Sequence, residues 1–308
     1  MFYCYKKMLM NKLILLSAIV GSLLAPIASA QEQLPAAKLY SRENLVAWCI
    51  VPFDSKNRTP VQRAEMVKKL GFGKVAYDWR DSHVPTFEQE ILEYKKHSLE
   101  YFAFWSTHEK AFELFAKHDL HPQIWQIAPA PAGKTNEERV AAAVKQMLPL
   151  VERTRKMGCK LGLYNHGGWN GEPENMVAMC KLLRDEHKAD HVGIVYNLHH
   201  AHDRIADFDK ALAAMRPYLL CLNLNGMTTD GDKKGKKILP LGAGEHDLAL
   251  LKTIQRSGYC GPISIIGHTG DDVEQRLQDN LDGLDWLLPQ LDGKQPGPRP
   301  QFRTYKNP

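Results

Sequence analysis

The chain has 308 residues, of which 44% are hydrophobic and 24% are charged, and it carries a formal net charge of +5 at pH 7. Its length accommodates one large α/β domain or two small ones. No basic face is concentrated in the sequence, and the one basic cluster, at 232–237, lies among glycine and aspartate residues as in a solvated loop. The composition therefore argues against a partner that is a nucleic acid.

The first thirty residues have the pattern of a secretory signal peptide. Three lysines precede the apolar run 13–30, which ends in the small-x-small sequence Ala28-Ser29-Ala30. We expect cleavage after Ala30 and export, to the periplasm in a Gram-negative source; a retained N-terminal anchor is the alternative. Loss of the three lysines would lower the formal charge from +5 to +2. No later apolar run is long enough to cross a membrane, so we expect no membrane contact after cleavage.

Five cysteines follow the predicted cleavage point. An odd number without a CxxC or CxxxC spacing does not make a disulfide framework or a zinc site. Cys49 and Cys221 lie inside apolar runs, which indicates buried thiols that pack as small hydrophobic side chains.

Eight short apolar runs, bounded by Gly, Pro and Asn, are typical of strands that are buried on both faces. They lie at 44–53, 74–79, 101–106, 122–128, 160–166, 191–197, 218–225 and 261–268.

Helical patterns fill the gaps between these runs. Thr59-Pro60 begins a helix that Gly71 ends, 135–157 is long and amphipathic, and further helices begin near Pro173, Asp207, Asp247 and Asp271. Eight strand–helix units predict an α/β protein with a single-domain (β/α)8 TIM barrel over 44–292. We expect an N-terminal extension at 31–43 and a flexible Pro- and Lys-rich tail at 293–308. No G-x-G-x-x-G turn follows the first strand, which disfavours a dinucleotide-binding fold.

The carboxyl ends of barrel strands form the active site, so the residues found there are the candidate site residues. They are rich in amide, imidazole and indole groups and poor in carboxylates. The candidates at or just past the strand ends are Asp78, Trp79 and Arg80 for the second strand, Trp105 for the third, Gln126 for the fourth, Asn165, His166 and Trp169 for the fifth, Asn197 and His200 for the sixth, Asn223 and Asn225 for the seventh, and His268 for the eighth.

Three segments, "GLYNHGGW", "VGIVYNLHHAH" and "LPLGAGEHDLALLKTIQRSGYCGPISI", resemble the xylose isomerase-like barrels of the sugar isomerase and epimerase superfamily. The resemblance covers nearly the whole chain after the predicted signal peptide. It implies a fifth strand ending in Glu-Asn-His, a sixth ending in Asp-x-x-His, a histidine on the seventh and a glutamate on the eighth. In the family these residues usually hold a divalent ion that polarises a sugar carbonyl and the adjacent hydroxyl.

This chain departs from that pattern at most ligand positions. Tyr164 stands at the glutamate position, Asn197 at the aspartate, Asn223 at the histidine and Ile266 or Gly267 at the second glutamate, whereas His200 is retained. Mg²⁺ and Mn²⁺ prefer anionic oxygen ligands. We therefore predict no metal cofactor; a site for Zn, Ni or Cu built from His166, His200 and His268 is the alternative.

Alternation along the sixth strand places Asn197 and His200 toward the barrel axis and leaves His199 and His202 to face the helices or solvent. Asp78 and Arg80 form either a local ion pair or a substrate contact. Indoles at strand ends, including Trp79, can stack on a sugar face; the others are Trp105, Trp125 and Trp169.

These residues and the resemblance predict an exported enzyme that acts on a neutral carbohydrate or keto-sugar by isomerisation, epimerisation or β-elimination. Each reaction begins with removal of a proton next to a carbonyl. His200 or His166 would be the base, and Arg80 with Asn223 or Asn225 would stabilise the developing negative charge. Asp78 completes the predicted catalytic group.

Two other functions remain as alternatives. A barrel that has lost catalysis and only binds carbohydrate fits the missing carboxylates. A metal-dependent nuclease on a related barrel is disfavoured by the charge and by the same missing carboxylates. The sequence leaves the oligomeric state open.

Overall fold

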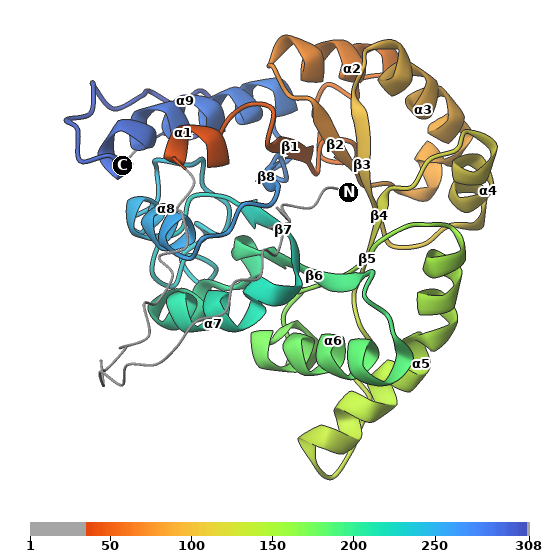
Figure 1. The fold of residues 1–308 in the computed structure, drawn as a ribbon. Helices are drawn as coiled ribbons and strands as arrows, with labels where there is room; N and C mark the ends of the chain where they lie inside the picture. Colours follow the sequence, from red (N-terminus) through yellow and green to blue (C-terminus); the bar gives the residue numbers. More distant parts are fainter. Residues whose placement is uncertain (1–34, 307–308) are drawn as a thin grey trace, which may run out of the picture. The chain divides into compact units, whose positions relative to one another are not determined.

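A computed structural model describes residues 35–306, and these form a closed barrel of eight parallel strands paired in chain order (Figure 1). The predicted (β/α)8 barrel is therefore confirmed, whereas the predicted signal peptide lies outside the described residues. All the strands except β3 are shorter than the apolar runs that predicted them. They are β1 (Leu45–Trp48), β2 (Lys74–Tyr77), β3 (Glu100–Trp105), β4 (Gln123–Gln126), β5 (Leu161–Tyr164), β6 (Val192–Asn197), β7 (Leu219–Leu224) and β8 (Ile263–Ile266).

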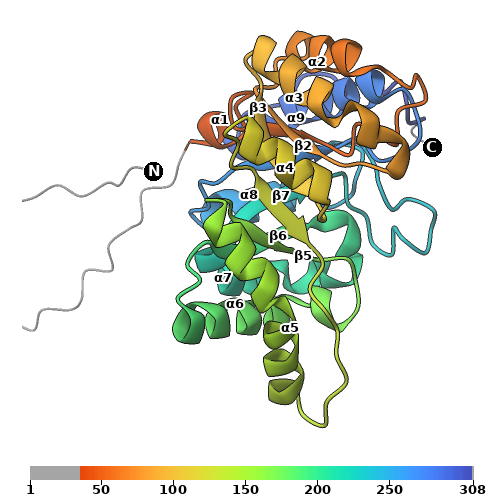
Figure 2. The ribbon, with the colours of Figure 1, turned by 90° about the vertical axis from the view of Figure 1, so that its right-hand side faces the viewer.

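Helices surround the strands, as Figures 1 and 2 show from two directions. They are α1 (Ala36–Leu39), α2 (Pro60–Lys69), α3 (Phe87–Lys96), α4 (Glu109–Lys117), α5 (Asn136–Lys156), α6 (Pro173–His187), α7 (Phe208–Met215), α8 (Asp247–Arg256) and α9 (Val273–Leu291). Short 3-10 turns lie at Asp81–Thr86, Trp169–Gly171, Leu198–His200, His202–Asp207 and Arg216–Tyr218. Between residues 35 and 306, no helix is both long and apolar enough to span a bilayer.

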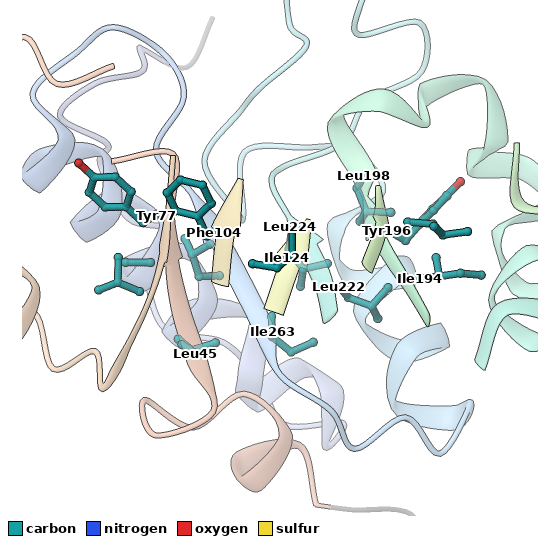
Figure 3. Packing of buried hydrophobic residues seen from close by; sticks show 14 of the residues in the cluster. Leu45, Tyr77, Phe104, Ile124, Ile194, Tyr196, Leu198, Leu222, Leu224 and Ile263 are labelled. Carbon is teal, nitrogen blue, oxygen red and sulfur yellow. The ribbon is translucent and has the colours of Figure 1, made fainter. Parts of the chain in front are cut away.

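Two apolar cores hold the barrel together. One fills the space between strands and helices, where side chains such as Tyr77, Phe104 and Leu222 are fully buried (Figure 3). The other lies inside the barrel and is largely aromatic toward the carboxyl ends of the strands. Alternate strand residues supply the two cores because successive side chains point to opposite faces.

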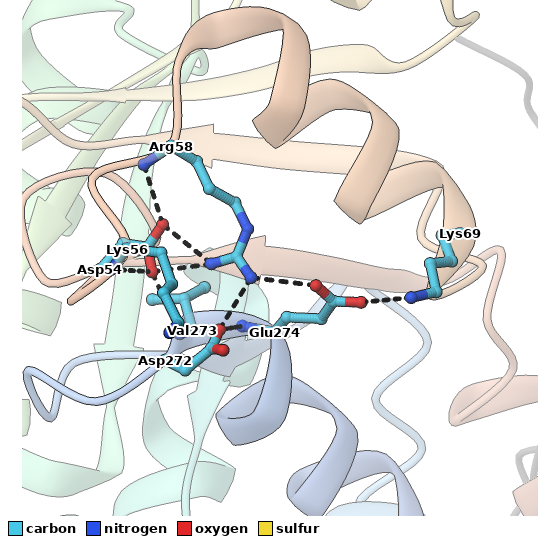
Figure 4. A network of polar contacts seen from close by, with 7 residues as sticks. All are labelled: Asp54, Lys56, Arg58, Lys69, Asp272, Val273 and Glu274. Atoms are coloured by element: carbon cyan, nitrogen blue, oxygen red, sulfur yellow. Dashed lines mark hydrogen bonds and ion pairs between the residues drawn. The ribbon is translucent and has the colours of Figure 1, made fainter.

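The first and last units of the barrel are joined by a network centred on Arg58 (Figure 4). Its guanidinium lies 2.8 Å from Asp54 in the β1–α2 loop and 2.8 Å from Asp272, the N-cap of α9. Glu274 bridges the same guanidinium, at 2.9 Å, to Lys69 of α2. Three carboxylates around one arginine make this an extended network with partly buried members, and such networks stabilise more than isolated surface pairs.

The segment that follows α9 packs back onto that helix. Asp279, fully buried in α9, accepts hydrogen bonds from the backbone N–H groups of Arg303 and Thr304, and the Arg303 guanidinium lies 2.9 Å away. Arg299 donates to the carbonyl of Gly242 at 2.7 Å. The C-terminal segment therefore also contacts the long loop between β7 and α8.

Candidate active site

A cavity of about 170 Å³ opens where the strands end at their carboxyl side. Drug-sized ligands occupy pockets of roughly 300–1,000 Å³, so this cavity fits a smaller molecule. Its walls are aromatic, imidazole and charged. The lining residues are Trp48, Cys49, Phe53, Asp78, Arg80, Trp105, Tyr164, His166, His199, His200 and His268.

The floor of the cavity is formed by aromatic rings from three strands. Trp105 packs edge-on against Tyr164, with ring centroids 4.5 Å apart, and Trp48 lies 5.8 Å from Trp105. Trp125 closes the layer below, 4.9 Å from Trp48. Edge-to-face packing of this kind gives a rigid apolar surface.

Asp78 is the one carboxylate among the lining residues, and it is 2% exposed. Its Oδ1 accepts the N–H of Val51 at 3.4 Å, whereas its Oδ2 has no hydrogen-bond partner. Burial raises the pKa of Asp78 to about 7, and the charge of Arg80 opposes that rise. A carboxyl group that titrates near neutral pH can accept or donate a proton during catalysis.

Arg80 does not form an ion pair with Asp78 among the described contacts. Its Nη1 donates to the carbonyl of Trp79 at 2.6 Å, and its guanidinium lies over the ring of Phe53, 5.2 Å from the centroid. The side chain is exposed at the mouth of the cavity. Of the two interpretations offered by the sequence, the geometry fits a contact to substrate better than a local ion pair.

Four histidines line one side of the cavity. The ring centroids of His199 and His200 are 3.7 Å apart, and those of His166 and His200 are 4.3 Å apart. The ring centroids of His268 and Phe53 are 3.5 Å apart, with the two rings tilted by 31°. Burial, reinforced by the neighbouring imidazoles and by Lys237, lowers the pKa of His200 to about 3. Burial likewise lowers the pKa of His268 to about 4, so both rings are neutral near pH 7.

The expectation that His199 faces the helices or solvent is wrong. The strand alternation stops at Asn197, because Leu198–His200 form a 3-10 turn that brings His199 to the cavity. The side chain of Asn197 fixes this turn: its Oδ1 accepts from the backbone N–H of His199 at 3.3 Å and from Nδ1 at 2.8 Å. His202 is buried, with its Nε2 2.9 Å from the carbonyl of Lys237.

Uncharged donors surround the phenol of Tyr164 beneath the cavity. Asn197 Nδ2 donates to the Tyr164 hydroxyl, and Ser264 donates to Asn223 Oδ1 at 2.5 Å. The indole N–H of Trp48 and the amide of Asn223 are also buried; neither has a partner within ordinary hydrogen-bond geometry, but both interact with the Tyr164 hydroxyl and oppose the rise of its pKa. Burial raises the pKa of Tyr164 above its ordinary value, which keeps the hydroxyl protonated. The group is a set of N–H and O–H donors without a formal charge.

The structure places several predicted site residues outside the cavity lining. Trp79 donates to the carbonyl of Trp105 at 2.8 Å and packs on Phe104. Asn165 bridges β5 to β6 through the backbone of Asn197. The remaining members bind other loops: Gln126 donates to Ile127, Trp169 to Asn136, and Asn225 to Gly226 and Lys237.

The residues at the family's metal-ligand positions do not fit a divalent ion. Tyr164, Asn197, Asn223 and Ile266 offer no anionic oxygen, and the buried N–H groups of Trp48 and Asn223 would repel a cation. Within residues 35–306, no group of three or more His, Cys, Asp or Glu side chains is arranged to hold a metal ion. The alternative site for Zn, Ni or Cu at His166, His200 and His268 stays a prediction of the sequence.

Five lining residues were not among the predicted site residues: Trp48, Cys49, Phe53, Tyr164 and His199. Cys49 and Phe53 follow β1, where a run of apolar residues extends to position 53 and hides the point at which the strand ends. Cys49 has a positive φ of 57°, an uncommon conformation for a residue other than glycine. Sequence patterns gave no signal for that turn.

Comparison with known proteins assigns the chain to a family. The sequence model for xylose isomerase-like TIM barrels matches residues 105–290, which is more than half of the chain. No curated protein matches the sequence.

Solved structures match most of the chain at low identity. A 3-keto-D-glucoside 4-epimerase from E. coli is 15% identical, with a TM-score of 0.58 over 80% of this chain and 98% of that one. A D-tagatose 3-epimerase-like protein is 14% identical, with a TM-score of 0.59 over 81% and 98%. A probable 3-DHS dehydratase from Bacillus anthracis is 12% identical, with a TM-score of 0.57 over 76% and 97%. At these identities the likeness extends to the fold.

Proposed function

Because the chain belongs to the xylose isomerase-like TIM barrel family, we propose that it is an enzyme that removes a proton next to the carbonyl of a small carbohydrate or keto-sugar. One observation carries this proposal: the cavity places a buried carboxyl group, Asp78, in the same small space as the N–H of Trp48 and the O–H of Tyr164. The epimerases and the dehydratase of similar fold support a reaction of this class, which includes isomerisation, epimerisation and β-elimination.

Asp78 is the base in this proposal. Its ionised Oδ2 takes the proton, the electron pair of the broken C–H bond moves into the carbonyl, and an enolate forms. In an isomerisation the proton of the adjacent hydroxyl passes to the enolate oxygen, and the protonated carboxyl returns its proton to the former carbonyl carbon. In a β-elimination the enolate re-forms the carbonyl, the β C–O bond breaks, and the carboxyl gives its proton to the departing hydroxide. A pKa of about 7 makes the carboxylate a stronger base than an ordinary aspartate while leaving it half ionised at neutral pH.

The enolate oxygen needs donors that are already oriented toward it. The Trp48 indole N–H is buried near the Tyr164 hydroxyl and has no partner within ordinary hydrogen-bond geometry. Tyr164 accepts a bond from Asn197, which leaves its own O–H free to donate. We assign these two donors the stabilising role that the sequence suggested for Arg80, Asn223 and Asn225. The proposed reaction therefore proceeds without a divalent metal.

The histidines are assigned to binding rather than to base catalysis. With a pKa of about 3, His200 stays neutral and is a weaker base than Asp78 at neutral pH. Neutral imidazoles donate from one nitrogen and accept at the other, which suits sugar hydroxyls. Epimerisation would need a second group that donates a proton to the opposite face of the same carbon. We assign that role to the N–H of His166 or His200, which both line the cavity.

Hydrogen exchange tests the proposal directly. The protein is incubated in D₂O with a panel of ketoses and 3-keto-glucosides, and loss of the C–H signal next to the carbonyl is followed by NMR. We expect exchange or turnover with at least one compound, unchanged by EDTA and abolished in Asp78→Asn. Asp209→Asn, an exposed aspartate on α7, is the matched control and retains exchange.

Three outcomes contradict the proposal. Binding without exchange or turnover supports the carbohydrate-binding alternative. Exchange that persists in Asp78→Asn assigns the base elsewhere, and loss of exchange with EDTA overturns the metal-free mechanism.

A further inference from the structure

Two cationic side chains at this site lack a carboxylate partner. Arg80 lines the cavity, and Lys237 lies in the β7–α8 loop, where its carbonyl is held by His202 and Asn225. Neither makes an ion pair with any carboxylate of the chain between residues 35 and 306. Elsewhere in the fold, arginines such as Arg58 and Arg204 are surrounded by carboxylates.

The groups around these two cations do not neutralise them. The four lining histidines are uncharged near pH 7, and the charge of Lys237 is among the causes that lower the pKa of each of them. Asp78 is the one carboxylate of the cavity lining, and it is buried and only partly ionised at that pH. The entrance therefore carries a positive potential, and a cleft of one sign concentrates ligands of the opposite sign.

The geometry points to a sugar acid as the substrate, with its carboxylate bound by Arg80 and an imidazole N–H at the mouth while the sugar ring lies on the aromatic floor. This inference rests on the proposed function, because the reacting carbon must reach Asp78. It replaces the neutral substrate expected from the sequence. A planar guanidinium matches a planar carboxylate through two parallel hydrogen bonds, a geometry that an ammonium group does not offer.

Arg80 and Lys237 have different parts in this arrangement. The Arg80 guanidinium is placed over Phe53, and the ring centroids of Phe53 and His268 are 3.5 Å apart, so arginine and imidazole lie on one continuous surface. Lys237 lines no part of the cavity itself and acts as a longer-range charge. We therefore expect Arg80 to determine affinity for the acid and Lys237 to contribute less.

Calorimetric titration of matched pairs tests this inference. The probes are D-glucose with D-glucuronate, D-galactose with D-galacturonate, and D-mannose with D-mannuronate, and D-glucose 6-phosphate distinguishes a phosphate from a carboxylate. Titrations use the wild type and Asp78→Asn, in which the ligand is not consumed. In at least one pair we expect the acid to bind about tenfold more tightly or better, as one charge-assisted hydrogen bond provides.

Three further results are expected. Arg80→Gln removes most of the preference for the acid, measured as the ratio of the dissociation constants of the neutral sugar and the acid. Arg139→Gln, which alters an arginine that stacks on Trp169 outside the cavity, keeps the preference. The preference shrinks between about 50 mM and about 500 mM salt, because salt screens exposed charges.

The inference is overturned if no acid binds more tightly than its neutral partner, or if Arg80→Gln keeps the preference. Tighter binding of the sugar phosphate than of every acid overturns the carboxylate assignment. Failure of the proposed function is recognised separately: acids then bind through Arg80, yet neither these acids nor the compounds of the exchange panel lose a C–H signal in D₂O.

Discussion

Replacing Asp78 with asparagine removes a buried charge and leaves the shape of the side chain nearly unchanged. Burial raises the pKa of this carboxyl from 3.8 to about 7, so the folded protein binds the proton more tightly than the unfolded chain. Stability from this group is fully present below about pH 4 and is lost as the pH rises through about 7. At about 1.4 kcal/mol for each pH unit between the two pKa values, the ionised carboxylate costs about 4 kcal/mol above pH 7.

We therefore expect Asp78→Asn to be more stable than the wild type at about pH 8, by up to about 4 kcal/mol, and to differ little at about pH 4. The asparagine Oδ1 still accepts from Val51 N–H. The asparagine NH₂ takes the place of Oδ2, which has no hydrogen-bond partner. Like the protonated carboxyl group at low pH, the asparagine side chain is uncharged. The difference in stability between the two proteins therefore reports the effect of the charge.

Urea unfolding of both proteins across this pH range provides the measurement. Asp247, also buried and with its pKa raised to about 6, contributes to both proteins and cancels in the difference. Activity should change in the opposite direction: kcat/KM of the wild type rises with pH through about 7, and Asp78→Asn is inactive at every pH. A stability difference that does not vary with pH, or a variant that is less stable at about pH 8, refutes the reasoning.

Three other predictions follow from separate features. Tyr164→Phe leaves the Asn197 amide without its acceptor, so we expect a loss of about 1–2 kcal/mol in the free energy of unfolding and about 10²–10³-fold in kcat; an unchanged kcat would remove Tyr164 from the mechanism. Gly193→Ala places a Cβ 2.3 Å from the carbonyl oxygen of Tyr218, which should cost about 3 kcal/mol in urea unfolding, whereas the control Gly73→Ala meets no atom within 4 Å. Residues 1–30 fused to a phosphatase that is active only after export should yield activity outside the cytoplasm, and an inactive fusion would contradict the predicted signal peptide.

The barrel was predictable because its pattern is repeated eight times and depends on local apolar periodicity. The same pattern predicted some strands to end several residues later in the sequence than they do. The run 44–53 has no polar interruption, although β1 ends at Trp48 and Cys49 adopts a positive φ. Such a turn is determined by contacts across the barrel rather than by neighbouring residues, which is why Cys49 and Phe53 escaped the prediction.

The membership of the cavity was only partly predictable. His166, His200 and His268 line it as expected, and Asp78 lies among them. Trp79 occupies an equivalent place in the sequence but packs on Phe104, because a two-residue period cannot say which way a side chain turns after the strand has ended.

Electrostatic character was the least predictable property, because it depends on burial. Histidine titrates near neutral pH in water and aspartate does not, so the sequence favoured His200 as the base. In the fold, burial reverses their order: the pKa of His200 falls to about 3 and that of Asp78 rises to about 7. Desolvation always favours the neutral form of a group, and so it moves acids and bases in opposite directions.

The neutral residues at the expected metal-ligand positions and the carboxyl group of Asp78 can be explained together. In a barrel each strand ends independently, so a charge can be lost from one strand and supplied by another without a change of fold. Here β5 and β6 end in Tyr164 and Asn197, and Asn223 is the last residue but one of β7. These side chains are neutral hydrogen-bonding groups, and the carboxyl group comes from Asp78, the residue after β2. Proton removal and charge stabilisation act on different atoms of the substrate. A base on one strand can therefore remove the proton while neutral donors on other strands stabilise the enolate oxygen, without a metal held by anionic ligands. On this argument, moving the carboxylate back, as Tyr164→Glu with Asp78→Asn, should not restore activity, because the N–H donor of Trp48 would then face an anion and hydrogen-bond to it instead of to the substrate.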